Sequence, residues 1–462
     1  MLDDTIAAIA TPVGEGGLAV IRISGTQALA IGDRIFSPAG KSSLKPSAAA
    51  SHTIQFGHVL RDGKTIDEVL VAIMRAPRTF TREDIVEITC HGGILPAKMV
   101  LDAALASGAR LAEPGEFTRR AFLNGRIDLA QAEAVADLIH SRTELALRAA
   151  NEQLAGKLSQ RINELREGLM KTLAHVEAYI DFPEEDIAEE TKDQLLGRLD
   201  RGVAFMDELL RTANEGQILR RGIRAAIIGR PNAGKSSLLN QLLGHERAIV
   251  SSIPGTTRDT IEETANIRGL PVVFIDTAGL REAQDEIEVE GIRRSHESLQ
   301  KAEIILHVLD ASEPLTEADE TYLREVAGKK RILIRNKMDL PAKLELPEGV
   351  GQAKKSALAV VDVCCLTGKG IETLKDAIKN LVWSGEIRTE MLQVMINSRH
   401  QEALARARGA TVRTVEALRA GVTLELAAMD LRIAVNAVGE IVGKTATEDL
   451  LDMIFSQFCI GK

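Results

Sequence analysis

GRPNAGKS, residues 229–236, overlaps the end of the strand-like run RAAIIG and the start of a stretch of helical pattern, SSLLNQLL. In this context a GxxxxGKS pattern predicts a phosphate-binding loop, because glycines let the backbone fold around phosphate oxygens and a helix start adds N–H donors. We expect Lys235 to be catalytic and to contact the outer phosphates, and Ser236 to coordinate Mg2+. A chance glycine-rich turn would be a serious alternative for an isolated motif, but three further motifs follow.

Two of these motifs are expected to meet at the γ-phosphate. PGTTRD, residues 254–259, offers Thr257 as a second hydroxyl ligand for Mg2+. DTAG, residues 276–279, closes the apolar run PVVFI. We expect Asp276 to be an outer-sphere metal partner and the Gly279 N–H to reach the γ-phosphate.

The last motif, NKMD at residues 336–339, follows the strand-like run RILIR. The Asp339 carboxylate can accept from both N1–H and the 2-amino group of guanine, a donor pair that adenine lacks. Asn336 would face the N7 side of the base, and Lys337 would pack along the nucleotide. Together the motifs predict a guanine-specific, Mg2+-dependent GTPase. The predicted GTP-binding residues are Asn232, Ala233, Gly234, Lys235, Ser236, Ser237, Ser251, Ser252, Ile253, Pro254, Gly255, Thr256, Thr257, Asp276, Thr277, Ala278, Gly279, Asn336, Lys337, Met338 and Asp339.

Two positions depart from the usual pattern of such sites. Leu280 stands where many regulatory GTPases carry a glutamine that orients water, so hydrolysis needs help from elsewhere. The loop that supports guanine is also ambiguous. A backbone N–H of Cys364-Cys365 could serve guanine O6, and Ser356-Ala357 is a rival, so the choice stays open. For the cysteine pair itself, small buried side chains are a better interpretation than redox chemistry.

The flanking patterns predict a multidomain protein. Residues 1–118 mix short β-branched runs with Gly, Pro and Ser, which is typical of an α+β domain. Residues 119–217 and 382–462 carry Leu, Ala, Glu and Arg at helical spacing and predict all-α segments. Between them, residues 218–381 alternate strand-like and helical runs, which predicts a parallel doubly wound α/β sheet. The simplest architecture inserts this α/β domain into one discontinuous helical domain.

Composition sets outer limits on function. The chain has 462 residues, 45% hydrophobic and 27% charged, and a formal net charge of -9, so an RNA partner would need a local basic surface. The four cysteines lack CxxC spacing, which argues against a disulfide framework or a zinc site. The amino terminus is acidic and no apolar stretch is long enough to cross a bilayer. We therefore expect a cytoplasmic protein without a membrane partner.

Beyond the GTPase motifs, several longer stretches resemble the MnmE (TrmE) family of tRNA modification GTPases over nearly the whole chain. The terminal stretch, with Cys459-Ile460-Gly461-Lys462, is the most specific of them. The stretches are DTIAAIATP (4–12), GLAVIRISG (17–25), FTREDIVEITCHGG (80–93), EPGEFTRRAFLNGRIDLAQAEAVADLI (113–139), YIDFPEEDI (179–187) and FCIGK (458–462).

The resemblance implies a domain layout and a reaction. Family members have an amino-terminal domain that forms a homodimer and binds a tetrahydrofolate derivative of the 5-formyl or methylene type. Their helical domain is discontinuous and their GTPase domain is inserted in it. With the flavoprotein MnmG (GidA), which carries FAD, they form a heteromeric complex. That complex installs aminomethyl or carboxymethylaminomethyl groups at C5 of the wobble uridine of certain tRNAs.

The resemblance also assigns folate contacts. Arg22, Glu87 and Arg126 match the family's folate contacts, and Lys462 would reach the same pocket. Arg126 stands where the family has lysine, a change that preserves charge but alters hydrogen-bond geometry. Cys459 would either act near the chemistry, as a catalytic residue, or only anchor the tail.

The resemblance also implies how hydrolysis proceeds although Leu280 replaces the usual water-orienting glutamine. Members of the family use K+ and dimerisation of the GTPase domain for activation, and the cation stabilises charge that develops during phosphoryl transfer. Asn232 matches the K+ ligand of the phosphate loop, with Ser251, Ile253 and Thr256 in the companion loop. Glu288 matches the catalytic glutamate that orients water.

A second class of function remains compatible with the GTPase motifs. A GTP-switched RNA-binding or ribosome-assembly factor would need no modification activity. Against it, the residues after Ser384 contain no GxxG loop of the kind that an appended KH module uses on RNA.

Overall fold

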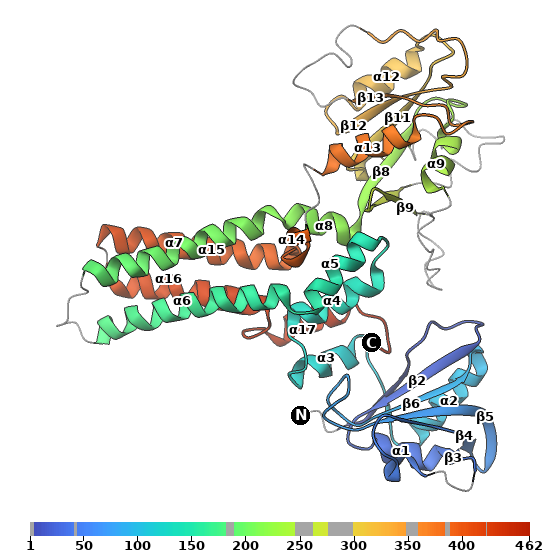
Figure 1. The fold of residues 1–462 in the computed structure, drawn as a ribbon, viewed down its shortest axis with the longest axis vertical. Coiled ribbons are helices and arrows are strands. Elements are labelled where there is room, and N and C mark those ends of the chain that lie inside the picture. The colour runs from blue at the N-terminus through green and yellow to red at the C-terminus, as the bar shows by residue number, and fades with distance from the viewer. Residues whose placement is uncertain are drawn as a thin grey trace. The chain divides into compact units, whose positions relative to one another are not determined.

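In the computed structural model the chain divides into two compact units. Figure 1 labels their helices and strands. The first comprises Met1–Ala136, Ser159–Lys192 and Arg413–Lys462, and the second comprises Asp137–Leu158 and Asp193–Val412. The residues that the structure describes are 4–40, 44–181, 189–244, 262–275, 299–347, 359–383, 389–421 and 423–462. The turn predicted around Pro183 lies outside these ranges. Within them, no helix is both long and apolar enough to cross a bilayer.

The first unit begins with a seven-stranded sheet in the order β3-β4-β5-β6-β2-β1-β7, antiparallel except for the β1–β7 pair. Its helices α1 and α2 pack on the apolar core of the sheet, which includes Ile21, Val71 and Ile88. Alternating buried and more exposed side chains along β2 reflect this one-sided packing. The bounds are β1 Ile6–Ile9, β2 Leu18–Ser24, α1 Ala28–Ile35, β3 Phe36–Pro38, a 3-10 turn Pro46–Ala48, β4 Thr53–Arg61, β5 Lys64–Met74, β6 Ile85–His91, α2 Ile94–Ala106 and β7 Arg110–Leu111.

Helix α3, Glu116–Leu123, is joined to the amino-terminal segment by a buried ion cluster. The Arg120 guanidinium, 1% exposed, lies 2.9 Å from Glu116, 2.7 Å from Asp4 and 3.2 Å from Glu83. A buried arginine is tolerated only when its donors are satisfied by charged partners, and three carboxylates meet most of that need here. The cluster therefore keeps α3 against the start of the chain.

Helix α4, Leu129–His140, and helix α17, Glu448–Phe455, pack through an apolar cluster that includes Leu129, Leu451, Phe455 and Phe458. Phe458 lies just before the terminal residues, so its burial fixes where the tail begins. Helices α4, α6 and α15, and also α7, Glu189–Arg211, each include residues of both units. The bounds are α4 Leu129–His140, α6 Lys157–Asp181, α15 Ser398–Ala420, α16 Leu424–Ile441 and α17 Glu448–Phe455.

The second unit contains a six-stranded sheet in the order β13-β12-β11-β8-β10-β9. All its pairs are parallel except the edge pair β9–β10. Helices α9 and α13 pack on one face, and Val326, directly after α12, packs with the other. The predicted parallel doubly wound sheet is thus confirmed. The bounds are β8 Ile223–Ile228, α9 Lys235–Leu243, β9 Glu263–Ile267, β10 Leu270–Phe274, β11 Ile304–Asp310, α12 Glu317–Glu325, β12 Arg331–Asn336, β13 Ala359–Asp362 and α13 Ile371–Val382.

Helices α5, α8 and α14 of the second unit pack around Trp383 and Leu270. Leu270 belongs to β10, so this cluster joins the sheet to the neighbouring helices of the same unit. The bounds are α5 Glu144–Leu154, α7 Glu189–Arg211, α8 Ala213–Arg221 and α14 Thr389–Gln393.

Candidate functional site

The phosphate loop connects β8 to α9 and depends on two glycines. A Cβ on Gly229 would lie 2.2 Å from the Val308 carbonyl oxygen, and one on Gly234 would lie 2.1 Å from Asn336 Nδ2. Both glycines have positive φ, at 143° and 99°. Asn232 also adopts a left-handed conformation, with φ of 60°. Glycine is therefore required at both positions, because the loop backbone packs directly against Val308 and Asn336. A glycine-rich loop at a helix start is the arrangement that binds phosphate through backbone N–H groups.

Lys235 begins α9 and folds back onto the loop. Its Nζ donates to the carbonyl oxygens of Gly229, at 2.8 Å, and Arg230, at 2.9 Å. Burial lowers the pKa of Lys235. A nearby phosphate would favour the charged form and supply stronger acceptors than these carbonyls.

Ser236 follows Lys235 in the first turn of α9, with a partly buried side chain. A hydroxyl oxygen beside a phosphate loop is the kind of hard ligand that Mg2+ takes together with phosphate oxygens. The residues of the loop therefore fit Mg2+ bound jointly with nucleotide. Among the described residues, no cluster of three or more His, Cys, Asp or Glu side chains could hold a metal without it.

Asn336 ties three segments of the site together. It is 3% exposed, its Nδ2 donates to the Ala233 carbonyl at 2.9 Å, and its Oδ1 accepts from the Cys365 N–H at 3.1 Å. The NKMD motif at the end of β12 is thus joined both to the phosphate loop and to the segment after β13. Both ends of the expected nucleotide site meet at the carboxyl ends of parallel strands.

The cysteine pair lies beside Asp339. Cys364 Sγ donates to Asp339 Oδ1 at 3.2 Å, and Gln241 Nε2 donates to the Cys365 carbonyl at 2.8 Å. Burial raises the pKa of the Cys365 thiol to about 11, so that thiol is protonated at neutral pH. Of the two guanine-loop candidates, Cys364-Cys365 is therefore next to the NKMD motif, whereas Ser356-Ala357 lies outside the described residues.

Two contacts of this site were missed by sequence reasoning. Gln241 lies on α9, where nothing in its spacing distinguishes it from a solvated helix residue. Asp310 pairs with Lys337 at 2.6 Å. A signal for Asp310 existed, because it closes the strand-like run EIILHVLD at the ligand edge of a predicted parallel sheet.

Much of the predicted site lies outside the described residues, which end with Ile275 on the β10 side. The Thr257 ligand for Mg2+, three of the K+ ligands and the catalytic Glu288 therefore stay predictions. The predicted residues concerned are Ser251, Ser252, Ile253, Pro254, Gly255, Thr256, Thr257, Asp276, Thr277, Ala278, Gly279 and Glu288.

The predicted folate residues form a second, separate group in the first unit. Arg22 and Glu87 are cross-strand partners on β2 and β6, with Nε and Oε1 2.7 Å apart. The Arg22 guanidinium also lies 5.5 Å from the centre of the Phe117 ring. Arg126 instead stacks on Phe80, at 5.0 Å. Arginines over aromatic rings beside a carboxylate suit a ligand that has both a flat heterocycle and carboxylates.

The terminal residues pack against the same part of the first unit. Arg22 Nη1 donates to the Gly461 carbonyl at 3.5 Å, and the Phe117 N–H donates to the Lys462 carbonyl at 3.1 Å. Gly461 has φ of 93°, and a Cβ there would lie 2.5 Å from the Ile9 carbonyl oxygen. The Cys459 side chain is exposed. The structure thus brings the tail backbone to Arg22, while the thiol remains accessible.

Comparison with known proteins identifies the family. A family model described as the GTP-binding protein TrmE N-terminus matches residues 5–126, and one for the MnmE helical domain matches residues 129–459. A tRNA modification GTPase MnmE from Geobacillus kaustophilus is 50% identical over 465 residues, covering 99% of each chain. The chain belongs to the MnmE family. It is therefore a member of a family of GTP-hydrolysing enzymes, as its motifs and its resemblance predicted.

Other MnmE proteins are similar over the same length. The MnmE of Thermoanaerobacter pseudethanolicus is 46% identical over 464 residues and covers 100% of both chains. Among solved structures, an Era variant from Aquifex aeolicus is 26% identical over 40% of this chain and 66% of its own, with a TM-score of 0.25.

Proposed function

We propose that this MnmE-family chain is a K+-activated GTPase that acts with a FAD-carrying flavoprotein of the MnmG type. Together they form aminomethyl or carboxymethylaminomethyl groups at C5 of the wobble uridine in certain tRNAs. The observation that supports GTP binding most directly is the position of Asn336, which bonds to both the phosphate loop and the Cys364-Cys365 segment. A tRNA substrate also implies a cytoplasmic location.

Mg2+ would be held by Ser236 and Thr257 together with the β- and γ-phosphates. When bound, Mg2+ neutralises charge on the phosphate oxygens. Lys235 would exchange its two carbonyl acceptors for phosphate oxygens. Asp339, oriented by the Cys364 thiol, would accept the two guanine donors.

K+ would be held by Asn232, Ser251, Ile253 and Thr256, with Glu288 orienting water. Support comes from Asn232, whose exposed side chain is carried on a left-handed backbone at the middle of the phosphate loop. Support also comes from Leu280, which cannot orient water as a glutamine would. A fixed monovalent cation would supply the missing stabilisation of developing charge.

A cation-exchange experiment tests this mechanism. GTP hydrolysis by the purified protein is expected to be at least about tenfold faster in K+ than in Na+ at equal ionic strength, because Na+ is too small for ligands spaced for K+. The rate is measured as phosphate release under saturating GTP. GDP binding in both salts serves as the control and should be similar. Equal rates would remove the cation mechanism and favour the alternative of a GTP-switched RNA-binding or ribosome-assembly factor.

A discontinuous helical domain with an inserted GTPase domain is our proposed architecture. It is supported by the helical family model, whose match starts at residue 129, before the parallel sheet, and ends at residue 459, after it.

The first unit would bind a tetrahydrofolate derivative of the 5-formyl or methylene type through Arg22, Glu87, Arg126 and Lys462. Arg22→Ala is expected to weaken binding of 5-formyltetrahydrofolate by about tenfold, since it removes a charged donor and its stacking on Phe117. Isothermal titration calorimetry measures the change. Arg61→Ala, on the exposed end of β4 in the same sheet, is the matched control. Unchanged affinity in Arg22→Ala would contradict the folate assignment and leave GTP binding untouched.

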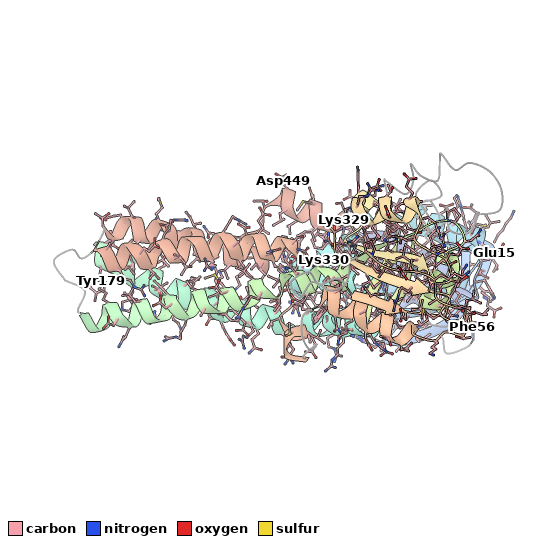
Figure 2. All side chains as sticks on the ribbon, turned by 90° about the horizontal axis from the view of Figure 1, so that it is seen from above. Glu15, Phe56, Tyr179, Lys329, Lys330 and Asp449 are labelled. Atoms are coloured by element: carbon pink, nitrogen blue, oxygen red, sulfur yellow. The ribbon has the colours of Figure 1, made fainter. Side chains whose placement is uncertain are left out.

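We also infer a homodimer formed through the first unit. The support is an exposed apolar surface on strands β4 and β5. Phe56 and Leu70 are cross-strand partners, 48% and 46% exposed, and Ile54 beside them is 70% exposed. Phe56 is labelled in Figure 2. A contiguous apolar patch of this kind is typical of an interface between copies of a chain.

A further inference from the structure

Asp310, the last residue of β11, has a buried carboxylate whose two oxygens are both engaged. Its side chain is 4% exposed. Oδ2 lies 2.6 Å from Lys337 Nζ. Oδ1 accepts from the Ser312 N–H at 2.9 Å and from the Ser312 hydroxyl at 2.6 Å. The orientation of the carboxylate is therefore set from both sides.

The charge state of this group follows from its contacts. Burial alone would raise the pKa of Asp310, but hydrogen bonds from Lys337 and Ser312 outweigh it and hold the pKa below its usual range. The carboxylate is ionised at neutral pH. Lys337 is thus paired with a charged group that is itself immobilised, which restricts the lysine far more than a surface ion pair would.

Lys337 is constrained at its backbone as well. Its φ is 65°, in the left-handed region that residues with a Cβ seldom adopt. Such a conformation persists only when surrounding contacts determine it. Here the preceding residue, Asn336, is bonded to the phosphate loop, and Asp310 holds the far end of the lysine side chain. The course of the lysine stem is set by these two anchors.

A second cation connects Asp310 to the phosphate loop. Arg230 Nη2 lies 3.9 Å from Asp310 Oδ2 and 2.6 Å from Glu313 Oε2, and Arg230 Nε lies 3.9 Å from Asp319 Oδ2. The Arg230 carbonyl accepts from Lys235 Nζ at 2.9 Å. Asp310 therefore contacts the lysine expected at the base directly, and it is linked through Arg230 to the lysine expected at the phosphates.

We propose that Asp310 is a positioning residue of the nucleotide site, which holds the Lys337 ammonium so that the lysine stem packs along the bound guanine nucleotide. This inference rests on the proposed GTP binding. Asp310 acts through Lys337 and does not touch the nucleotide. Without the carboxylate, the Lys337 side chain would lose conformational entropy each time a nucleotide binds. The nucleotide would therefore bind less tightly and dissociate faster.

A double-mutant cycle on the full chain tests the inference. The dissociation rate of a fluorescent N-methylanthraniloyl-GDP is measured for the wild type, Asp310→Asn, Lys337→Met and the double variant. Asp310→Asn is expected to speed dissociation by about tenfold, and to add less than about twofold once Lys337 is replaced. Glu317→Gln removes an exposed carboxylate from the neighbouring helix α12 and is the matched control, with an unchanged rate.

Two outcomes would overturn the inference. In one, Asp310→Asn releases the labelled GDP at the wild-type rate; in the other, Asp310→Asn speeds its release equally whether residue 337 is Lys or Met. A wild type that fails to bind GDP would instead refute the proposed function. Melting without nucleotide reports whether each variant folds. If Asp310→Asn does not fold, Ser312→Ala takes its place in the cycle, because it loosens the carboxylate without removing its charge. Ser312→Ala is then expected to speed nucleotide dissociation by about threefold, and this acceleration should disappear when Lys337 is also replaced by Met. An unchanged dissociation rate in Ser312→Ala would overturn the inference.

Discussion

Asp339→Asn is expected to weaken binding of GDP and GTP by about a thousandfold, because an amide cannot accept from both N1–H and the 2-amino group of guanine. One donor of the base would face an N–H group of the new side chain and lose its hydrogen bond in a desolvated site. Xanthine carries a carbonyl oxygen where guanine has its 2-amino group. The side-chain N–H of asparagine can donate to that oxygen. Xanthosine triphosphate binding should therefore not weaken.

The comparison of two bases makes this experiment specific. Affinities for guanosine and xanthosine nucleotides are measured by equilibrium titration. Asp376→Asn, which replaces an exposed carboxylate on α13, is the matched control and should bind GTP normally. If the variant bound neither guanosine nor xanthosine nucleotides, the substitution would have damaged the fold. Unchanged GTP affinity would refute the assignment of Asp339 to guanine.

Lys235→Ala is expected to reduce GTP hydrolysis by about three orders of magnitude, since the side chain is the expected phosphate ligand of the loop. In the structure the ammonium group already lies inside the loop, 2.8 Å from the Gly229 carbonyl oxygen. Its removal eliminates a charge placed where negative charge develops during phosphoryl transfer. The two hydrogen bonds that Lys235 donates to the loop would be lost, but Gly229 and Gly234 keep the positive φ values that shape the loop, so the variant should fold.

Single-turnover phosphate release measures the effect of this substitution. Lys330→Ala replaces an exposed lysine, labelled in Figure 2, that directly precedes β12. This variant serves as the matched control and should hydrolyse GTP at the wild-type rate. Circular dichroism checks that both variants fold. A Lys235→Ala protein with more than about a tenth of the wild-type rate would contradict the role of the lysine.

The parallel sheet could be predicted because four apolar runs each end in a polar or glycine-containing loop and alternate with stretches of helical pattern. These runs are AAIIG, PVVFID, EIILHVLD and RILIRNKMD. The antiparallel edge strand β9 could not be predicted in this way. Its run, ETANI, has only two apolar residues, and its pairing with β10 depends on the tight turn at Arg268 and Gly269, with φ of 54° and 88°. A short edge strand of this composition gains its stability from its neighbour and carries little signal of its own.

The candidate site shows the same contrast. Gly229, Gly234, Lys235 and Ser236 could be assigned from one short motif, because a phosphate loop is built from consecutive residues and its geometry is local. The contacts of Gln241 and Cys364 could not be assigned. They join residues 124 and 25 positions apart, so they exist only once the chain has folded.

By itself, the sequence determined the family, the order of the GTPase motifs and the places where glycine is required, since these follow from local backbone chemistry and from residue identity. Only the tertiary structure decided which segment lies beside Asp339 and which carboxylate pairs with Lys337. Those partners come from different strands of one sheet, and strand order brings their carboxyl ends together irrespective of their distance along the chain. An ion pair such as that of Asp310 with Lys337 depends on separation in space, and no pattern of neighbouring residues encodes that separation.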